Sequence, residues 1–537
     1  MKSQLDKLIR SLDLISNRFD EKSKQQKNLV LRQISKIKLP LKNSLFVYSE
    51  LLLFLCAHPD DKKTLSLVEQ ELKRITATLK KTKKVSKDSF NNSGLPYTET
   101  ETGFSYDFVR WLLTHPNCKA ELSRFENPSF ELNEVLRLTL PSLEKSETTA
   151  GLSNMELLDS LLLKKQSRLS FLVSELSKID HLPFVKDHLF EGLGSYITIT
   201  PKDNYFSKFY NRLLPRSVFF HDELLKRFDF ESLLNSEFSE KPTLSKSELN
   251  KAILIVKNSM AITERETDTV TFMDESSFRL FELERGISVA IYGMKPERQL
   301  PLESYVGFTL FKNGFPAAYG GSWIFGERSN FGINIFESYR GGESGYMMCQ
   351  LLRVYRQVFK INYFEIEPYQ FGLDNPEGIS SGAFWFYYRF GFRPLDKKLL
   401  LIAEKESKKI RLKKDYRTSK KVLEQFTESN IILKMERSTP PGLYDIIAKV
   451  KHMMQRQYAG NRVKAENDCV MRFKIKTRWA KILNRHEEQV MKEVALWAEA
   501  MRINDLEKLD ILSQMIKTKP IDLYQYQNLL LKFFKNK

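Results

Sequence analysis

Residues 339–346, Tyr-Arg-Gly-Gly-Glu-Ser-Gly-Tyr, separate a predicted strand from a predicted helix, and this arrangement decides the fold expected for the chain. The strand is the segment Gly332 to Glu337, and the helix is the segment Tyr346 to Phe359, where apolar residues repeat with helical period. Three glycines between a strand and a helix let backbone N–H groups turn toward a ligand at the positive end of the helix, and proteins commonly hold phosphate in this way. The sequence therefore predicts a phosphate-binding loop over residues 340–345.

The segments on both sides of this loop predict a mixed sheet. Upstream, Asn313-Gly314 lies between two apolar runs, and Asn-Gly in this position strongly indicates a hairpin. With the strand before the loop, this hairpin makes a three-stranded meander. Downstream, Tyr363 to Glu367 is predicted to be another strand, and residues 382–392 are predicted to be a helix rich in aromatic side chains.

The order of these parts resembles the GCN5-related N-acetyltransferase (GNAT) superfamily, over the middle-to-C-terminal region of the chain. That family's diphosphate loop is written Gln/Arg-x-x-Gly-x-Gly/Ala, and Arg340, Ser344 and Gly345 fall into register with it. Glu343 stands where the family usually has its central glycine, and a carboxylate close to a diphosphate repels it unless the side chain points away. The family's closing motif, a tyrosine four residues before a Gly-Phe pair, is met by Tyr387.

The resemblance implies a GNAT-like mixed sheet and acetyl-CoA or another acyl-CoA as co-substrate. In the family, the gap between two central strands admits the pantetheine arm, and the loop after the first of these strands binds the diphosphate. The residues implied for this loop are Arg340, Gly341, Gly342, Ser344 and Gly345. Backbone N–H groups and the positive charge of Arg340 would stabilise phosphates bound there.

The chemistry that this resemblance implies is acyl transfer from a thioester to an amine. The amine must lose a proton before it attacks, so a carboxylate is expected to act as base, directly or through a water. The departing thiolate leaves more easily if a tyrosine donates a proton to it. The candidates for the base are Glu337, Glu365 and Glu367, and the candidate for the acid is Tyr387.

Simpler structural roles stay open for the same residues. The glycines after Arg340 can form a tight turn that binds no ligand, because glycine pairs serve turns in many proteins. Tyr387 lies within five consecutive aromatic residues, so it fits core packing as well as catalysis. Glu365 and Glu367 alternate with apolar residues and therefore project from one face of their strand, where salt bridges are the simpler expectation.

Composition indicates a multidomain protein without a membrane span. The chain has 537 residues, which is enough for several domains with ample cores. Its densest apolar run, Leu45 to Ala57, is too short to cross a bilayer, and the N-terminus begins an amphipathic helix instead of a signal peptide. We therefore expect a cytoplasmic protein. Its four cysteines lie far apart with no CxxC pattern, so neither a disulfide framework nor a metal site is predicted.

The net charge of +18 raises the question of a polyanionic partner. Positive charge is concentrated in two clusters, Lys80 to Lys87 and Lys397 to Lys421. Aromatic residues do not interleave with these clusters as a base-stacking platform would require, so a solvated basic surface is the favoured interpretation. Nucleic acid and an anionic membrane surface stay open as alternatives.

Four regions follow along the chain, and the predicted fold class is multidomain α plus α/β. Residues 1–90 and 97–240 are expected to be helical, with a short strand at Tyr196 to Thr200 in the second region. Residues 244–437 are expected to form the GNAT-like domain, in which Phe278 to Met294 is extended and Asn430 to Met435 is a late strand. Residues 442–537 are predicted to form a helical C-terminal domain after Pro440-Pro441-Gly442.

Taken together, these features predict an acyl-CoA-dependent N-acyltransferase whose amine acceptor, a small molecule or a protein, is not readable from the sequence. One alternative is a non-catalytic protein that keeps the GNAT fold for ligand sensing or as a scaffold. Another is a transferase that takes its acyl group from an aminoacyl-tRNA, which would give the basic surface a purpose. Oligomeric state is likewise not readable.

Overall fold

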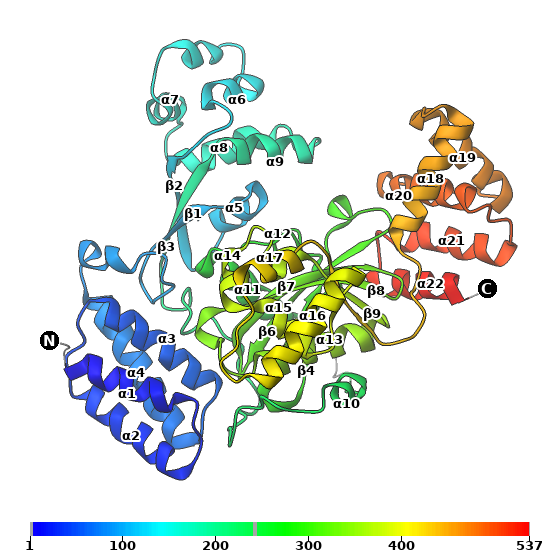
Figure 1. Ribbon diagram of the computed structural model, residues 1–537. Coiled ribbons are helices and arrows are strands. Elements are labelled where there is room, and N and C mark those ends of the chain that lie inside the picture. The colour runs from blue at the N-terminus through cyan, green and yellow to red at the C-terminus, as the bar shows by residue number, and fades with distance from the viewer. Residues whose placement is uncertain (1–3, 240–243, 536–537) are drawn as a thin grey trace.

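The computed structural model describes residues 4–239 and 244–535. The protein is a mixed α/β protein with a helical N-terminal region, a central mixed sheet of eight strands with flanking helices, and a helical C-terminal region (Figure 1). This architecture confirms the predicted fold class. No helix within the described residues is long and apolar enough to cross a membrane.

The N-terminal region is a bundle of four helices. Asp20 and Asp61 cap α2 and α4, because each carboxylate accepts a hydrogen bond from the backbone N–H three residues further on. α3 is apolar nearly all round and is mostly buried, so it forms the centre of the bundle. The elements are α1 (Gln4–Ser16), α2 (Glu21–Ser35), α3 (Asn43–Ala57), α4 (Lys62–Lys81) and the 3₁₀ helix η1 (Lys84–Phe90).

The second region is less helical than predicted, because it contains a three-stranded antiparallel sheet in the order β1-β3-β2. Only β3 coincides with a strand expected from the sequence. β2 alternates buried and exposed residues over most of its length, but it follows directly on a helical pattern and was predicted to be helical with it. Residue 240, the predicted end of this region, lies outside the described residues. The elements are β1 (Thr100–Gly103), α5 (Tyr106–Leu113), β2 (Cys118–Phe125), α6 (Leu132–Thr139), η2 (Lys145–Thr149), α7 (Asn154–Leu161), α8 (Arg168–Ser177), α9 (Pro183–Gly192), β3 (Ser195–Pro201) and α10 (Phe230–Asn235).

The central sheet has the order β10-β11-β9-β8-β7-β6-β5-β4, and every neighbouring pair is antiparallel except β8 and β9, which are parallel. The expected hairpin joins β6 to β7, with Asn313 and Gly314 at φ of 46° and 85°, as a two-residue hairpin turn requires. Phe278 to Met294, predicted to be extended, supplies β4 and β5. The strands are β4 (Arg279–Glu282), β5 (Ile287–Tyr292), β6 (Ser304–Lys312), β7 (Phe315–Phe325), β8 (Arg328–Ile335), β9 (Tyr363–Ile366), β10 (Arg393–Pro394) and β11 (Ile431–Lys434).

The two faces of the sheet belong to different cores. Val306, Phe308 and Phe331 lie in a core that includes α13 (Ser344–Phe359) and continues into the N-terminal bundle. Ala290 and Tyr292 lie in a second core with α11 (Lys246–Thr263) and the second region. Both N-terminal regions are therefore packed against the sheet. The remaining elements before α13 are α12 (Asp268–Thr271), η3 (Glu275–Ser277), η4 (Glu284–Gly286), η5 (Pro296–Arg298) and η6 (Glu337–Tyr339).

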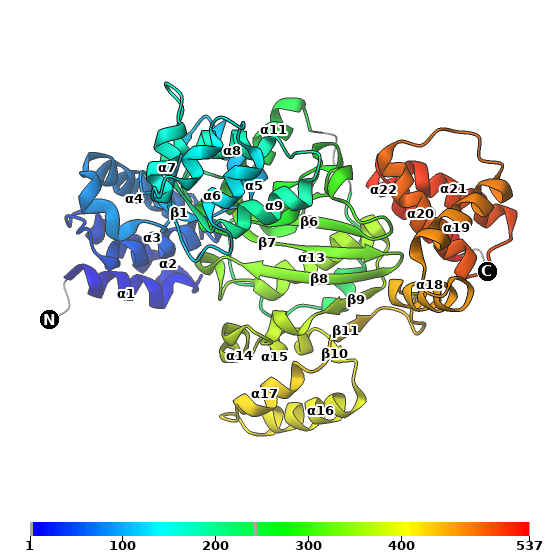
Figure 2. The ribbon, with the colours of Figure 1, turned by 90° about the horizontal axis from the view of Figure 1, so that it is seen from above.

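The chain after β9 forms the aromatic helix predicted from the sequence, and then two further helices, α16 and α17, which lie beyond α14 and α15 (Figure 2). The late strand expected at Asn430 to Met435 is β11. These elements are η7 (Pro368–Phe371), α14 (Pro376–Ser381), α15 (Ala383–Arg389), α16 (Lys397–Leu412) and α17 (Lys420–Phe426).

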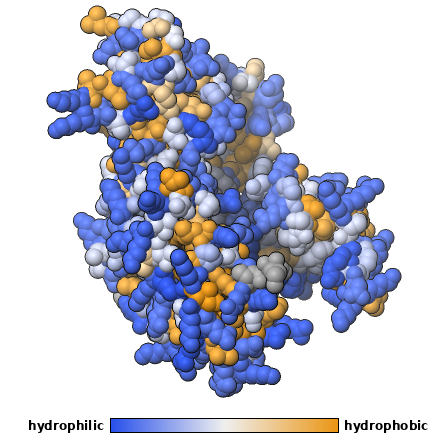
Figure 3. Space-filling view, turned by 90° about the vertical axis from the view of Figure 1, so that its left-hand side faces the viewer, coloured by the Kyte–Doolittle hydropathy of each residue, from blue (hydrophilic) through white to orange (hydrophobic). Residues whose placement is uncertain are grey.

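Five helices form the C-terminal region and have a core of their own. They are α18 (Leu443–Tyr458), α19 (Arg462–Thr477), α20 (Arg485–Ala500), α21 (Leu506–Thr518) and α22 (Leu523–Lys535). α22 returns to the sheet, because Gln527 donates hydrogen bonds to the carbonyls of Gly326 and Phe359. Seen from the side of the N-terminal bundle, the molecular surface is largely hydrophilic with scattered apolar residues (Figure 3).

Candidate functional site

The candidate site begins where β8 and β9 separate. These parallel strands pair at three positions only, from Arg328 opposite Tyr363 to Asn330 opposite Glu365. β8 continues to Ile335, but β9 ends at Ile366 and its chain turns into η7. The second half of β8 therefore keeps β7 on one side, and no strand of the described residues pairs with it on the other. The side chain of Gln370 lies beside Gly332 at this open edge.

A cavity of about 650 Å³ lies next to the open edge. The end of β8, the loop after it and the segment after β9 form one side, through residues such as Asn334, Arg340 and Tyr369. The opposite side comes from the end of α11 and from the two N-terminal regions, with Glu264 and Lys208 among the lining residues. Segments that are far apart in the sequence thus build one cavity.

The glycines of the loop differ in what surrounds them. Gly341 has a φ of +79°, and a Cβ placed on it would meet no atom within 4 Å, so its need for glycine comes from the backbone conformation alone. A Cβ on Gly342 would lie 3.0 Å from the ring of His58. A Cβ on Gly345 would collide with the ring of Phe390. Gly342 and Gly345 therefore permit close packing against α3 and the aromatic helix.

The loop presents free donors at the start of α13. The backbone N–H groups of Gly342, Ser344 and Gly345 have no acceptor in the described part of the chain. First-turn N–H groups form the positive end of a helix dipole, and α13 is a long helix of 16 residues. Arg340 is exposed beside them; its guanidinium pairs with the exposed carboxylate of Glu377 and donates to the carbonyl of Ile335.

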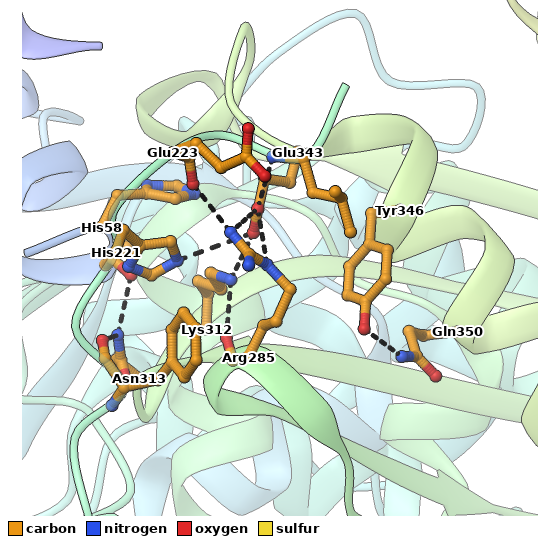
Figure 4. A network of polar contacts seen from close by, with 12 residues as sticks. His58, His221, Glu223, Arg285, Lys312, Asn313, Glu343, Tyr346 and Gln350 are labelled. Atoms are coloured by element: carbon orange, nitrogen blue, oxygen red, sulfur yellow. Dashed lines mark hydrogen bonds and ion pairs between the residues drawn. The ribbon is translucent and has the colours of Figure 1, made fainter. Parts of the chain in front are cut away.

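Glu343 is buried, and its side chain points toward Lys312, Arg285 and His221 (Figure 4). One of its carboxylate oxygens accepts a hydrogen bond of 2.5 Å from Lys312 Nζ. The other accepts from Arg285 Nε at 2.9 Å, from Arg285 Nη2 at 2.7 Å and from the backbone N–H of Leu225 at 2.8 Å. His221 Nε2 lies 3.6 Å from the first oxygen. The residue that departs from the family pattern is therefore the centre of a buried ion-pair network.

The network fixes the charges of its members. Burial by itself would raise the pKa of the Glu343 carboxyl, but His221, Lys312 and the Leu225 N–H outweigh burial and hold this pKa well below its usual range. Burial lowers the pKa of Lys312 to about 8, although Glu343 opposes that change. Burial also lowers the pKa values of His58 and His221, so both rings are neutral at neutral pH.

The same network holds the N-terminal bundle against the loop. The side-chain amide of Asn313, at the tip of the β6–β7 hairpin, donates to the carbonyl of Ala57 at the end of α3. The backbone N–H of His221 donates to the carbonyl of Pro59. The ring of His58 lies 5.2 Å from that of His221, measured between centroids. The end of α3 and the glycine loop, residues 340–345, therefore form one packed unit.

The predicted carboxylates lie in two places. Glu337 opens η6 just after β8, is exposed and lines the cavity, so it stands after the strand and not on it. Glu365 lies on β9, whereas Glu367, predicted to be on the same strand, follows its end and precedes η7; both line a smaller pocket of about 250 Å³. There Glu365 pairs with Arg328 at 3.1 Å, and Glu367 accepts a hydrogen bond from Asn330.

Tyr387 is buried in the aromatic helix, where its ring meets the rings of Phe386 and Phe392 edge to face. Burial raises the pKa of its hydroxyl well above the usual range. No residue of the described chain makes a hydrogen bond to this hydroxyl, and Tyr387 is not among the residues that line the large cavity. Tyr387 and Glu337 are therefore not brought into one cluster.

Sequence reasoning missed several residues that line the cavity or complete the buried network. Glu264 closes α11 in the left-handed conformation, and burial raises the pKa of its carboxyl. Arg265, next to it, also lines the cavity. The network partners Arg285 and His221 come from separate loops. None of these residues belongs to a motif, so nothing in the sequence pointed to their meeting.

Comparisons of this chain with protein-family models, with curated proteins and with solved structures gave no match.

Proposed function

We propose that this protein is an acyl-CoA-dependent N-acyltransferase of the GNAT type. The observation that carries the proposal is the junction of three features: a parallel strand pair that separates after three positions, a glycine loop that follows directly, and a cavity beside both. In the GNAT family the pantetheine arm enters between two such strands and the diphosphate lies on the loop. The order of these parts along the chain supports this binding mode.

The position of Glu343 supports diphosphate binding at the loop. At the surface, its carboxylate would repel a diphosphate. Because Lys312 and Arg285 neutralise it in the interior, the polar groups left at the loop are the free N–H groups and Arg340, whose guanidinium an anion would share with Glu377. An anion at the start of a helix is stabilised by such donors and by the helix dipole.

The open edge of β8 supports a place for the pantetheine arm. Backbone groups on that edge pair with no strand in the part of the chain that the structure describes, and the Gln370 side-chain amide lies beside Gly332. Amide groups of a pantetheine arm can exchange hydrogen bonds with both. The thioester would then lie close to the cavity, where an amine could approach it.

Among the candidates for the base, Glu337 fits best, since it is exposed and lines the cavity. Glu365 and Glu367 already hold polar partners in the smaller pocket, and we assign them a structural role. Tyr387 stays the candidate acid because its hydroxyl has no protein partner among the described residues. For this role its helix would have to move so that the buried hydroxyl reaches the thiolate.

The decisive experiment is calorimetric titration with coenzyme A and acetyl-CoA. Wild-type protein should bind both, and Gly341→Val should abolish binding without unfolding, because a β-branched residue disfavours the φ of +79° that aims the loop donors. Gly151→Val is the matched control: Gly151 also has a positive φ, +71°, and open space around it, but lies far from the loop in sequence. Absence of binding by the wild type would refute the proposal.

The distance of Tyr387 from the cavity favours one second candidate, a GNAT-fold protein that binds acyl-CoA without transferring the acyl group. A non-catalytic acyl-CoA-binding protein would give the same calorimetric result as the enzyme. Incubating it with acetyl-CoA and a panel of primary amines, and measuring free thiol, separates the two candidates. Release of thiol that depends on an added amine supports the enzyme, and binding without release supports the sensor.

A further inference from the structure

Helix α16 carries an unusual combination of charge and exposed apolar side chains. The basic segment, which we define as residues 395–421, contains nine lysines and two arginines against two aspartates and two glutamates. Of these eleven basic side chains, only Lys409 and Lys420 form an ion pair within the described chain. Of the other nine, Arg417 donates hydrogen bonds to the backbone carbonyls of Lys414 and Tyr416, and all nine are exposed without an ion-pair partner among the described residues.

The outer side of α16 also exposes leucines. Leu401 is 59% exposed and Leu412 is 84% exposed, and Leu395, just before the helix, is 54% exposed. Leu401 and Leu412 are eleven residues apart, which is close to three full turns, so they lie on one side of the helix about 16 Å from each other. The inner side is different: Leu399 and Ala403 are buried.

Lysines lie between and beside these leucines on the same outer side. Lys405 and Lys408 fall between Leu401 and Leu412 in sequence and within about 40° of them around the helix axis. All four side chains are exposed. The outer side of α16 is therefore an apolar line flanked by flexible cations, at a place where no other element of the described chain covers it.

We propose that the outer side of α16 binds the surface of an anionic membrane. A helix that lies flat in the interface buries its apolar side chains at the boundary of headgroups and acyl chains, while lysine stems extend along it and keep their charges at the lipid phosphates. Leu401 and Leu412 would insert together, and Lys405 and Lys408 would contact anionic headgroups. This proposal is independent of the proposed acyl transfer.

Exposed leucines distinguish this partner from a nucleic acid. Phosphates of RNA or DNA would satisfy the lysines but would leave Leu401 and Leu412 in water. Single-stranded nucleic acid also needs aromatic faces for stacking. Tyr416 is the only aromatic residue of the basic segment, and its hydroxyl is held by Glu406 at 2.7 Å. Charge and apolar exposure together fit a lipid surface.

The test is co-sedimentation of the full chain with vesicles of phosphatidylcholine alone and of phosphatidylcholine mixed with phosphatidylserine. Wild-type protein should sediment with the anionic vesicles only, and less at high salt. The double variants Leu401→Glu/Leu412→Glu and Lys405→Glu/Lys408→Glu should each weaken binding by at least about tenfold. Circular dichroism checks folding, which should persist because all four side chains are exposed.

The control is Leu14→Glu/Leu29→Glu, which removes two leucines of similar exposure, 69% and 57%, from the N-terminal bundle and should bind vesicles like the wild type. No sedimentation with anionic vesicles would overturn the proposal. Unchanged binding in the leucine variant of α16 would also overturn it. A parallel titration with single-stranded RNA addresses the other partner: tight binding that the lysine variant loses and the leucine variant keeps would assign the surface to nucleic acid instead.

Discussion

Replacing Glu343 by glutamine tests whether the buried network holds the loop together. The glutamine side chain has nearly the same size, so packing is preserved while the negative charge is lost. Lys312 is then left fully buried without a counter-charge, and Arg285, whose side chain is 15% exposed, loses its main partner. Breaking a buried ion pair by removing one member typically costs about 3 to 5 kcal/mol.

Deprotonation of Lys312 sets an upper limit on this cost. An unpaired buried ammonium releases its proton when staying charged is more costly. Lowering the pKa of a lysine from about 10.4 to about 7 corresponds to roughly 5 kcal/mol, at about 1.4 kcal/mol per pKa unit. We therefore expect Glu343→Gln to lower the free energy of unfolding by about 3 to 5 kcal/mol near pH 7. Because the unfolded state would then bind more protons than the folded state, the stability of this variant should rise with pH above neutrality.

The assay is a double-mutant cycle in urea, followed by circular dichroism, with Glu343→Gln, Lys312→Met and the double variant. Glu343→Gln leaves Lys312 buried without a counter-charge, and Lys312→Met leaves the buried Glu343 carboxylate with Arg285 as its one close cation. The double change removes both fully buried charges, so the double variant should lose less than the sum of the two. Glu377→Gln is the control, since Glu377 also pairs with an arginine of the loop but its side chain is 65% exposed. That change should cost less than about 1 kcal/mol.

Additivity of the two single changes within about 0.5 kcal/mol would refute the reasoning, because it would mean that Glu343 and Lys312 do not depend on each other. A cost for Glu343→Gln no larger than that for Glu377→Gln would contradict it as well. The second result would imply that the carboxylate reaches solvent and is free to repel a diphosphate.

Three further predictions follow from single positions. Burial lowers the pKa values of His58 and His221, so the stability that the neutral rings provide is present above about pH 6.5. As pH falls, the free energy of unfolding should decline by about 1.4 kcal/mol per pH unit for each ring. The urea midpoint should therefore drop on acidification, and it should drop less steeply in His58→Gln. Tyr387→Phe should reduce acyl transfer by roughly 10²- to 10⁴-fold with little change in acyl-CoA affinity, whereas Tyr388→Phe should not; full turnover in the first variant would remove the proposed acid. Gly345→Ala should lower unfolding free energy by about 1 to 3 kcal/mol, since its Cβ would collide with an aromatic ring, and an unchanged urea midpoint would show that the ring can move aside.

Local sequence patterns predicted several strands of the central sheet. Asn313-Gly314 fixed the hairpin because positive φ at both turn positions is a property of those two residues. The helical period after the loop predicted α13, and the apolar segment near Asn430 predicted β11. In the second region the same approach missed β1 and β2, because four to eight residues are too few for a period of two to stand out among helices.

The sequence by itself determined the parts whose conformation depends on their own residues: the glycine loop, the strands and helix around it, and the helical ends of the chain. Tertiary structure decided the direction of Glu343, because its side chain turns inward only where Lys312 and Arg285 meet it. It also decided that Glu337 reaches the cavity while Glu365 and Glu367 do not. Local conformation follows short-range sterics and hydrogen bonds, whereas the partner of a buried charge depends on chain segments brought together by folding, which no single stretch of sequence encodes.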